Sequence, residues 1–360
     1  MTIAKEKRNL ALAGALIGII AVVLVLLGNP KNMGFCIACF IRDIAGGLKL
    51  HTAAPVKYIR PEIIGLILGS FVISVGTKEF NARGGSSPML RFSIGFMVMI
   101  GCLAFLGCPF RMVLRLSAGD LNALIGLLGF AAGIGVGSFF LSKGFSLGRT
   151  RSQAPLEGSA ISIVNIILLI LAIAAPTLFA VSESGPGSMH AAVGISLAAG
   201  LAVGILAQRT RMCMAGGFRD LYLLKDGTLI CGFIALFVFA LAMNLITGNF
   251  KLGFVGQPVA HNAHIWNFLG MFVCGLGCCM LGGCPLRQLI LAGEGNSDSA
   301  ITVLGLLTGA AFSHNFGLAG AAGAVADGGG VKPAGKIAVI ACIVILLCIA
   351  CIKTFAKKED

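Results

Sequence analysis

Charged residues are scarce in this sequence: they make up 11% of its 360 residues, whereas hydrophobic residues make up 57%. A soluble globular chain needs a more polar surface than this composition supplies, so the soluble classes are excluded. Long stretches with almost no charge recur from one end of the chain to the other, and the mean hydropathy is +0.97. The sequence therefore predicts an all-α polytopic membrane protein.

Two further absences narrow the function. The sequence contains no glycine-rich phosphate-binding loop or other ATPase signature, so any transport is expected to be channel-like, ion-coupled or driven by consumption of the solute. None of the five histidines stands beside the cysteine motifs described below, which argues against a zinc site. We expect no cofactor and no resident metal.

Basic residues outnumber acidic ones and give a net charge of +13. Because Lys and Arg lie between the apolar segments, their expected partners are lipid headgroups and anionic solutes, with no nucleic acid. The distribution of basic residues favours cytoplasmic N- and C-termini, although the stretch from Lys31 to Arg60 opposes this orientation. Lys5, Lys7 and Arg8 precede a long apolar run without a small-residue cleavage site, so this run is expected to be the first span.

The apolar stretches predict about ten hydrophobic spans. They cover Leu10–Gly28, Pro61–Gly76, Leu90–Leu106, Leu121–Leu141, Ala160–Val181, His190–Gln208, Leu229–Thr247, Trp266–Gly282, Ala300–Gly320 and Gly335–Ile352.

A Gly-Cys-Pro-x-Arg motif occurs twice, at 107–111 and again at 283–287. In each copy a second cysteine precedes the motif cysteine by the same interval, Cys102 before Cys108 and Cys278 before Cys284. Proline lacks a backbone N–H and has a preset φ, so Cys-Pro is typical of an N-cap followed by the first residue of a helix. Such a thiol faces unpaired N–H groups and the positive end of the helix dipole, a place that attracts anions and favours thiolate.

A second motif supports the duplication. Residues 36–43 and 213–220 share the pattern Cys-x-Ala-x-x-x-Arg-Asp, which places Arg42 and Arg219 at equivalent positions. Each half therefore presents this motif, then two hydrophobic segments, then Gly-Cys-Pro-x-Arg.

Five crossings separate equivalent points of the two copies if the motif segments are re-entrant. Because five is odd, the sequence predicts two inverted-topology repeats with re-entrant Cys-containing segments and a substrate site near the midplane. Residues 1–155 are assigned to the first repeat in the membrane. Residues 156–352 are assigned to a linking span, the second repeat and an additional C-terminal span, and residues 353–360 to a short charged tail.

The four motif cysteines, Cys36, Cys108, Cys213 and Cys284, are the main candidates for a substrate path, with Cys102 and Cys278 as further members. A single membrane cysteine usually packs as a small hydrophobe, so the duplication carries this hypothesis. Cys39 forms a Cys-x-x-Cys pair with Cys36 and has Gly216 at the equivalent position. This pair suits redox chemistry or a soft solute. The cysteines without matched counterparts are interpreted as packing: Cys231, Cys274, Cys279, Cys342, Cys348 and Cys351.

The duplicated arginines are candidates for attracting an anion at the mouths of the path: Arg111, Arg287, Arg42 and Arg219. The alternative for Arg42 and Arg219 is a simple pairing with the neighbouring Asp43 and Asp220. His314 and Asn315 lie inside a predicted span, where a functional role and a helix-to-helix hydrogen bond are equally plausible readings.

Together, the doubled motifs in a glycine-rich chain of ten spans resemble the YeeE/YedE sulphur-transport family, which includes bacterial thiosulfate uptake proteins. The run from Gly34 to Asp43 is similar to the YedE-like branch proposed to handle selenium. The resemblance implies a multi-pass protein of the bacterial inner membrane whose thiols pass a sulphur oxyanion along by S–H hydrogen bonds. By motif this role falls on Cys36, Cys108, Cys213 and Cys284, while Cys39 departs from the single-cysteine pattern.

The leading hypothesis is a transporter, not an enzyme, that takes up a small inorganic sulphur or selenium anion through the bilayer. A competing hypothesis is a membrane thiol–disulfide or selenium-processing enzyme. A third is a membrane subunit that recruits a cytosolic sulphur- or selenium-carrier protein.

Overall fold

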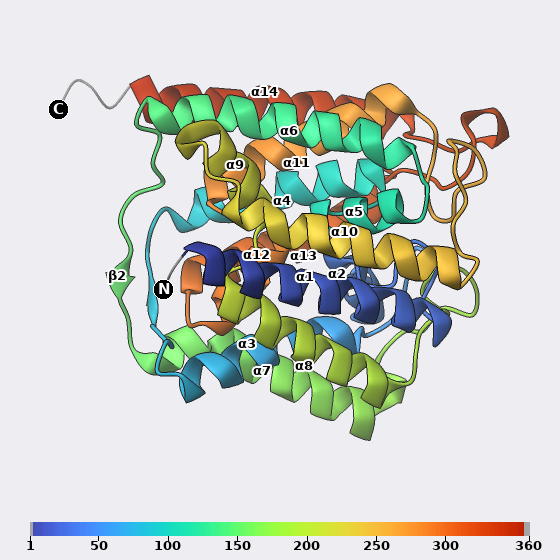
Figure 1. Ribbon diagram of the computed structural model, residues 1–360, viewed down its shortest axis with the longest axis horizontal. Helices are drawn as coiled ribbons and strands as arrows, with labels where there is room; N and C mark the ends of the chain where they lie inside the picture. Colours follow the sequence, from blue (N-terminus) through green and yellow to red (C-terminus); the bar gives the residue numbers. More distant parts are fainter. Residues whose placement is uncertain (1–2, 356–360) are drawn as a thin grey trace.

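The computed structural model describes residues 3–355, which fold almost entirely into helices (Figure 1). Ten helices are long: α1 Ile3–Leu26, α3 Pro61–Gly76, α4 Pro88–Phe105, α6 Asn122–Ser142, α7 Pro155–Ala174, α8 Val193–Thr210, α10 Thr228–Ile246, α11 His264–Leu281, α13 Ser297–Asn315 and α14 Pro333–Phe355. Four are short: α2 Ile37–Gly47, α5 Pro109–Ser117, α9 Met214–Leu224 and α12 Pro285–Gly293. The remaining elements are the 3₁₀ turns η1 Pro176–Leu178 and η2 Val325–Asp327 and the two-residue strands β1 Arg83–Gly84 and β2 Arg151–Ser152, which pair antiparallel.

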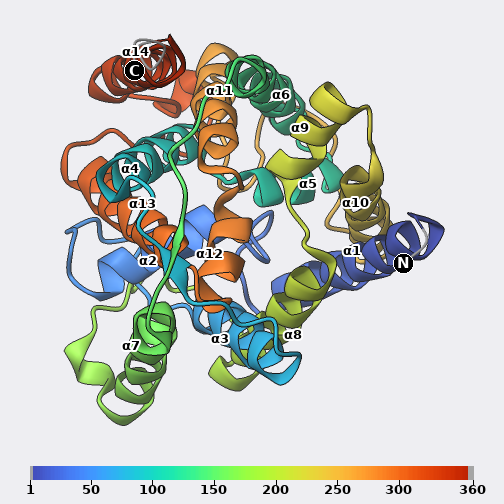
Figure 2. The same cartoon turned by 90° about the vertical axis from the view of Figure 1, so that its left-hand side faces the viewer.

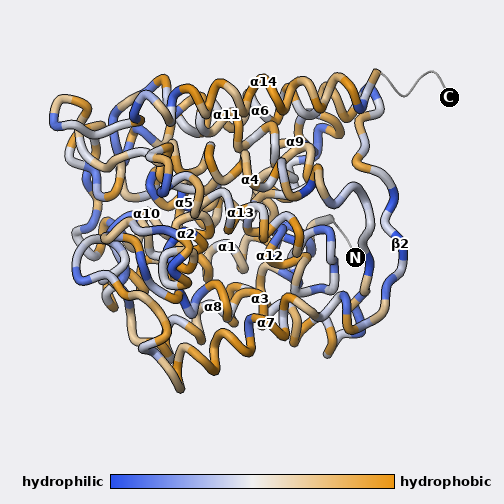
Figure 3. The backbone as a smooth tube through the Cα atoms, turned by 180° about the vertical axis from the view of Figure 1, so that it is seen from behind, coloured by the Kyte–Doolittle hydropathy of each residue, from blue (hydrophilic) through white to orange (hydrophobic). Residues whose placement is uncertain are grey.

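Each of the ten predicted spans coincides with one long helix, which confirms a polytopic all-α membrane protein. Within residues 3–355, eight segments are long and apolar enough to cross a membrane, and α3 is a shorter apolar helix. Apolar residues cover the outer helices, and hydrophilic segments gather at the two ends of the bundle, where β2 and the loops lie (Figure 3). Of the expected charged tail, Lys353–Phe355 continue α14, and residues 356–360 lie outside the described residues.

Glycines allow the long helices to approach one another closely. A Cβ atom on Gly14 of α1 would lie 1.9 Å from a backbone oxygen of α10, and one on Gly69 of α3 would lie 2.4 Å from a backbone oxygen of α8. Equivalent contacts join α6 to α11 through Gly129 and α4 to α13 through Gly305. Small residues at helix crossings are the usual means of packing in a bilayer, because apolar lipid offers no hydrophobic gain for helix association.

These contacts follow a pseudo-two-fold pattern. When α1–α6 are matched in order with α8–α13, the pair α1–α10 becomes α8–α3, and the pair α6–α11 becomes α13–α4. We call α1–α6 the first half and α8–α13 the second half. Helix α7 connects the halves, and α14 packs on α11, α6 and α4 at the edge of the bundle (Figure 2).

Equivalent helices of the two halves run in opposite directions. Gly28, after the end of α1, lies against His190, before the start of α8, while Leu10 of α1 shares a cavity with Thr210 at the end of α8. Helices α4 and α11 are also antiparallel, since Gly101 meets Gly270 and Val98 meets Gly277. The halves therefore have the inverted relationship that the positions of the motifs predicted.

Candidate functional site

The four motif cysteines each stand at the start of a short helix. Cys36 is the N-cap of α2 and Cys213 the N-cap of α9, and both have extended backbone conformations. The Cys36 sulfur accepts a hydrogen bond from the Cys39 backbone N–H at 3.3 Å, and the Cys213 sulfur accepts one from the Gly216 N–H at 3.2 Å. Each thiol thus takes the place that a Ser or Asn oxygen usually fills at a helix start.

Cys108 and Cys284 are the N-caps of α5 and α12, as the Cys-Pro pairs predicted. Pro109 and Pro285 occupy the first helical turn, and neither cysteine side chain makes a capping hydrogen bond. The first N–H groups of these two helices therefore keep the partial positive charge of a helix N-terminus.

The motif cysteines form two pairs, one in each half. The sulfur atoms of Cys36 and Cys108 are 4.0 Å apart, and those of Cys213 and Cys284 are 3.9 Å apart. All four side chains are buried, with at most 4% of their surface exposed. The structure therefore brings together the cysteines that the sequence singled out, at two pseudo-symmetric points inside the bundle.

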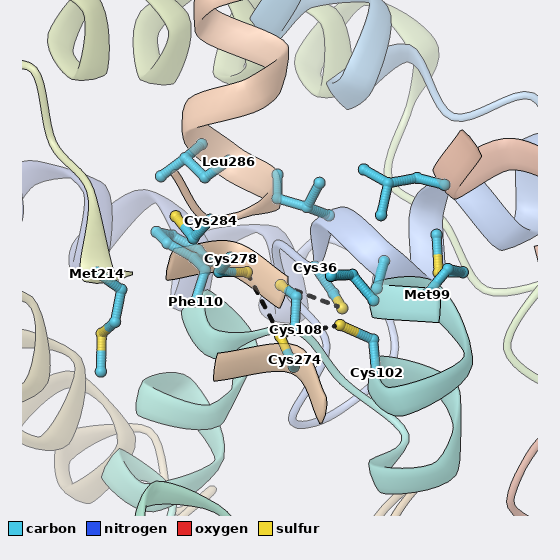
Figure 4. Close-up of a cluster of buried hydrophobic side chains, with 14 of the residues drawn as sticks. Cys36, Met99, Cys102, Cys108, Phe110, Met214, Cys274, Cys278, Cys284 and Leu286 are labelled. Carbon is cyan, nitrogen blue, oxygen red and sulfur yellow. Dashed lines mark hydrogen bonds between the residues drawn. The ribbon is translucent and has the colours of Figure 1, made fainter. Parts of the chain in front are cut away.

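A further group of thiols lies at the crossing of α4 and α11 (Figure 4). Cys102 donates to the Cys274 sulfur at 3.5 Å, and the sulfur atoms of Cys274 and Cys278 are 3.8 Å apart. The crossing is close because Gly101 and Gly270 face each other there. Cys274, which the sequence assigned to packing, thus bridges the duplicated Cys102 and Cys278. Its position in the thiol group could have been predicted, because residues four apart in a helix lie on the same face and Cys274 precedes Cys278 by four.

Cys39 belongs to the first half and has no equivalent cysteine in the second half. Its sulfur accepts a hydrogen bond from Nη1 of Arg111 at 3.5 Å, and it lies 4.0 Å from the Leu106 carbonyl oxygen. Since Gly216 replaces it in the second half, the thiol site of the first half holds one more sulfur atom and a guanidinium in direct contact.

Arg111 is fully buried and tied to three backbone segments. It donates to the carbonyl oxygens of Asn32 at 2.7 Å and Val259 at 3.0 Å, and also to that of Leu106. Asn32 and Val259 belong to the loops before α2 and before α11, so Arg111 ties the loops together at this end of the bundle.

Arg287, the counterpart of Arg111, has different surroundings. Its Nη1 donates to the Glu294 carboxylate at 3.0 Å, and 13% of its side chain is exposed. It lines a polar cavity of about 250 Å³ together with Arg83, Arg211 and Glu79. The two duplicated arginines therefore lie at opposite ends of the thiol groups, one enclosed by backbone and one at an open cavity.

Arg42 and Arg219 contact the neighbouring carboxylates, which supports their role as local ion pairs. Arg42 binds Asp43 at 2.7 Å, and Arg60 binds the other Asp43 oxygen at 2.8 Å, with all three side chains buried. Arg60 was not among the predicted site residues. It lies over the Phe40 ring at 4.5 Å and donates to the carbonyl oxygens of Pro186 and Met189.

In the second half, Arg219 binds Asp220 at 2.8 Å with 32% of the Arg219 side chain exposed. Gly227 stands before α10 where Arg60 stands before α3, and within residues 3–355 Arg219 is the one guanidinium paired with Asp220. Arg42 is therefore enclosed in a buried ion cluster, while its counterpart is a partly exposed pair.

The polar residues of α13 have structural partners. Asn315 donates to the Leu50 carbonyl oxygen at 2.9 Å, and the His314 ring lies 4.9 Å from that of His51. These contacts tie the end of α13 to the loop that follows α2, so the hydrogen bond of Asn315 joins a helix to a loop and not to another helix.

Comparison with known proteins gives three matches. A family model described as sulphur transport matches residues 209–359, which contain Cys213 and Cys284. The thiosulfate transporter TsuA of Spirochaeta thermophila is 35% identical over 99 residues, covering 28% of this chain and 29% of that protein. The thiosulfate transporter TsuA of Escherichia coli is 32% identical over 110 residues, covering 30% of each chain. The alignments thus span less than a third of these two relatives.

Proposed function

We propose that this chain carries a small sulphur-containing oxyanion across a lipid bilayer, because a family model described as sulphur transport matches residues 209–359. The observation that carries the proposal is the pair of thiol sites, Cys36–Cys108 and Cys213–Cys284, each formed where two short helices begin. The cargo passes between the two sites by way of Cys102, Cys274 and Cys278.

The chemistry of the two sites suits brief binding of a soft anion. A thiol is a weak hydrogen-bond donor and a polarisable acceptor. The N-termini of α2, α5, α9 and α12 add partial positive charge at each cysteine pair. An anion is therefore attracted to each site and still free to leave, which conduction requires.

Thiosulfate is the cargo that we propose first, because both relatives are named thiosulfate transporters. A selenium anion is the alternative cargo. What supports it is the contact of Cys39 with Arg111, which makes the thiol site of the first half different from a plain pair of thiols. We propose the bacterial inner membrane as the location, which the family resemblance implies, and cytoplasmic termini, which the distribution of basic residues favours. Recruitment of a cytosolic carrier protein remains an additional proposal.

One observation favours a second function. Sulfur atoms 3.9 to 4.0 Å apart need to move about 2 Å to form a disulfide. A membrane thiol–disulfide enzyme is therefore the competing proposal. It differs from transport in stoichiometry, since an enzyme changes the oxidation state of its solute or of its own cysteines during turnover.

The test is uptake of radiolabelled thiosulfate and selenite by proteoliposomes, with the oxidation state of the recovered solute measured. We expect Cys108→Ala and Cys284→Ala to abolish uptake while the protein remains folded. Cys348→Ala is the matched control, because Cys348 is exposed on α14 away from the thiol sites. Normal uptake in both motif variants would refute the transport path. Chemically altered solute would favour the enzyme.

A further inference from the structure

The polar cavity beside Arg287 has more positive than negative charge in its walls. It is lined by three arginines, Arg83, Arg211 and Arg287, and by two carboxylates, Glu79 and Glu294. It lies at the end of the bundle where the α8–α9 connection, the start of β1 and α12 meet, the side that faces the viewer in Figure 2.

Both carboxylates already have cationic partners. Glu294 accepts from Arg287 at 3.0 Å. Glu79 accepts from Arg209 at 2.9 Å and from the Gln208 amide at 2.7 Å. Within residues 3–355, Arg83 and Arg211 form no ion pair. Two guanidinium groups in one cavity are therefore left without a counter-ion from the described chain.

The backbone holds both of these arginines in fixed places. Arg83 belongs to the β1–β2 pair, and its N–H donates to the Gly295 carbonyl oxygen at 3.2 Å. Arg211 ends α8 in a left-handed conformation with φ of 53°, which a non-glycine residue rarely adopts. This turn directs the chain from α8 to Cys213, two residues later. The cavity is thus formed by anchored segments.

Two of the segments that line the cavity continue into the thiol pair of the second half, since Arg211 precedes Cys213 by two residues and Arg287 follows Cys284 by three. We propose that Arg83 and Arg211, with Arg287, form a binding subsite for a divalent oxyanion next to this thiol pair. A guanidinium presents a planar fork of donors that matches the oxygens of such an anion. The inference rests on the proposed function and assigns two residues that the cysteine motifs do not contain.

The test is binding of thiosulfate and of sulfate to the full chain in phosphatidylcholine nanodiscs, measured by calorimetry. We expect the double variant Arg83→Gln/Arg211→Gln to bind both anions at least tenfold more weakly. Arg151→Gln is the matched control, because Arg151 is exposed on β2 beside Gly84 and does not line the cavity. Its affinity should stay within twofold of the wild type.

The outcomes separate the two proposals. Wild-type affinity in the double variant overturns the subsite, whatever the transport assay gives. Arginine-dependent binding of sulfate in a protein that takes up no thiosulfate retains the subsite and refutes the proposed function. A third arm uses nanodiscs that contain phosphatidylglycerol. If the arginine dependence disappears there, a lipid headgroup occupies the cavity and the cargo subsite is wrong.

Discussion

Arg111 and Arg287 occupy equivalent positions in the two halves, yet Arg111 donates to three backbone carbonyl groups, whereas Arg287 donates to the Glu294 carboxylate. Arg111 is fully buried, and Arg287 is partly exposed at a cavity. The same motif therefore closes one end of the bundle and leaves the other open.

Replacing Arg111 should destabilise the fold more than replacing Arg287. Arg111→Leu leaves three carbonyl oxygens without their charged donor, and each such hydrogen bond contributes about 1.5–3 kcal/mol. We expect a loss on the order of 5 kcal/mol or more in the free energy of unfolding, measured with denaturant in detergent. Arg287→Leu removes one partly exposed ion pair and should cost about 1 kcal/mol or less. Equal losses in the two variants would contradict the enclosed position of Arg111.

The two aspartates that follow the duplicated arginines should respond differently to the same change. Asp43→Asn leaves Arg42 and Arg60 buried without a counter-charge, which typically costs about 3–5 kcal/mol. Asp220→Asn affects a partly exposed pair, and its cost should stay below about 1 kcal/mol. Thermal unfolding of the two variants in the same detergent checks this. A larger loss for Asp220→Asn would contradict the burial of the ion cluster formed by Asp43, Arg42 and Arg60.

Oxidation should link the motif cysteines within each half. A small apolar oxidant such as iodine removes two electrons and two protons from each thiol pair. We expect disulfides between Cys36 and Cys108 and between Cys213 and Cys284, identified by mass spectrometry of peptides. Uptake should fall as they form and return when a thiol reductant is added. Links that join Cys36 to Cys213 instead would contradict the assignment of one pair to each half.

The charge of the Glu79 carboxylate in the arginine-lined cavity should be insensitive to mild acid. The hydrogen bond from Gln208 and the nearby Arg209 lower the pKa of the Glu79 carboxyl. Because a lowered pKa keeps the carboxylate charged as the pH falls, its effect is lost only when the pH drops through the folded value. Glu79→Gln should therefore strengthen thiosulfate binding by a constant factor from neutral pH down to the usual pKa of Glu.

The control for that experiment removes the hydrogen bond instead of the charge. In Gln208→Leu the pKa of Glu79 returns toward its ordinary value. As the pH is lowered, Glu79 is then protonated earlier, so anion binding should begin to strengthen at a higher pH than in the wild type. An unchanged pH profile would show that Gln208 does not hold the Glu79 carboxylate in its ionised form.

Much of the fold could be predicted from the sequence because long apolar segments and duplicated motifs are local signals. The ten long helices, the starts of α5 and α12 at Cys-Pro, and the inversion of the halves were all predictable. The contacts of Arg60 and Cys274 were not. Each depends on a partner more than fifteen residues away or on another helix, such as Asp43 for Arg60 and Cys102 for Cys274.

The asymmetry of the candidate site could not be predicted from the sequence either. Arg111 and Arg287 have the same motif context, and only the loops that reach Arg111, through Asn32 and Val259, distinguish them. Loop positions depend on the packing of the helices they connect, which local patterns do not specify.

The arrangement of the sulfur atoms has a consequence for crystallography. Three cysteine pairs, Cys36 with Cys213, Cys102 with Cys278 and Cys108 with Cys284, are related by the internal duplication, whereas Cys39 and Cys274 have no counterpart. Sulfur scatters long-wavelength X-rays anomalously. An anomalous difference map from a native crystal would therefore show these three pairs as peaks related by the pseudo-two-fold axis, and the peaks of Cys39 and Cys274, which the axis leaves unmatched, would identify each half of the molecule.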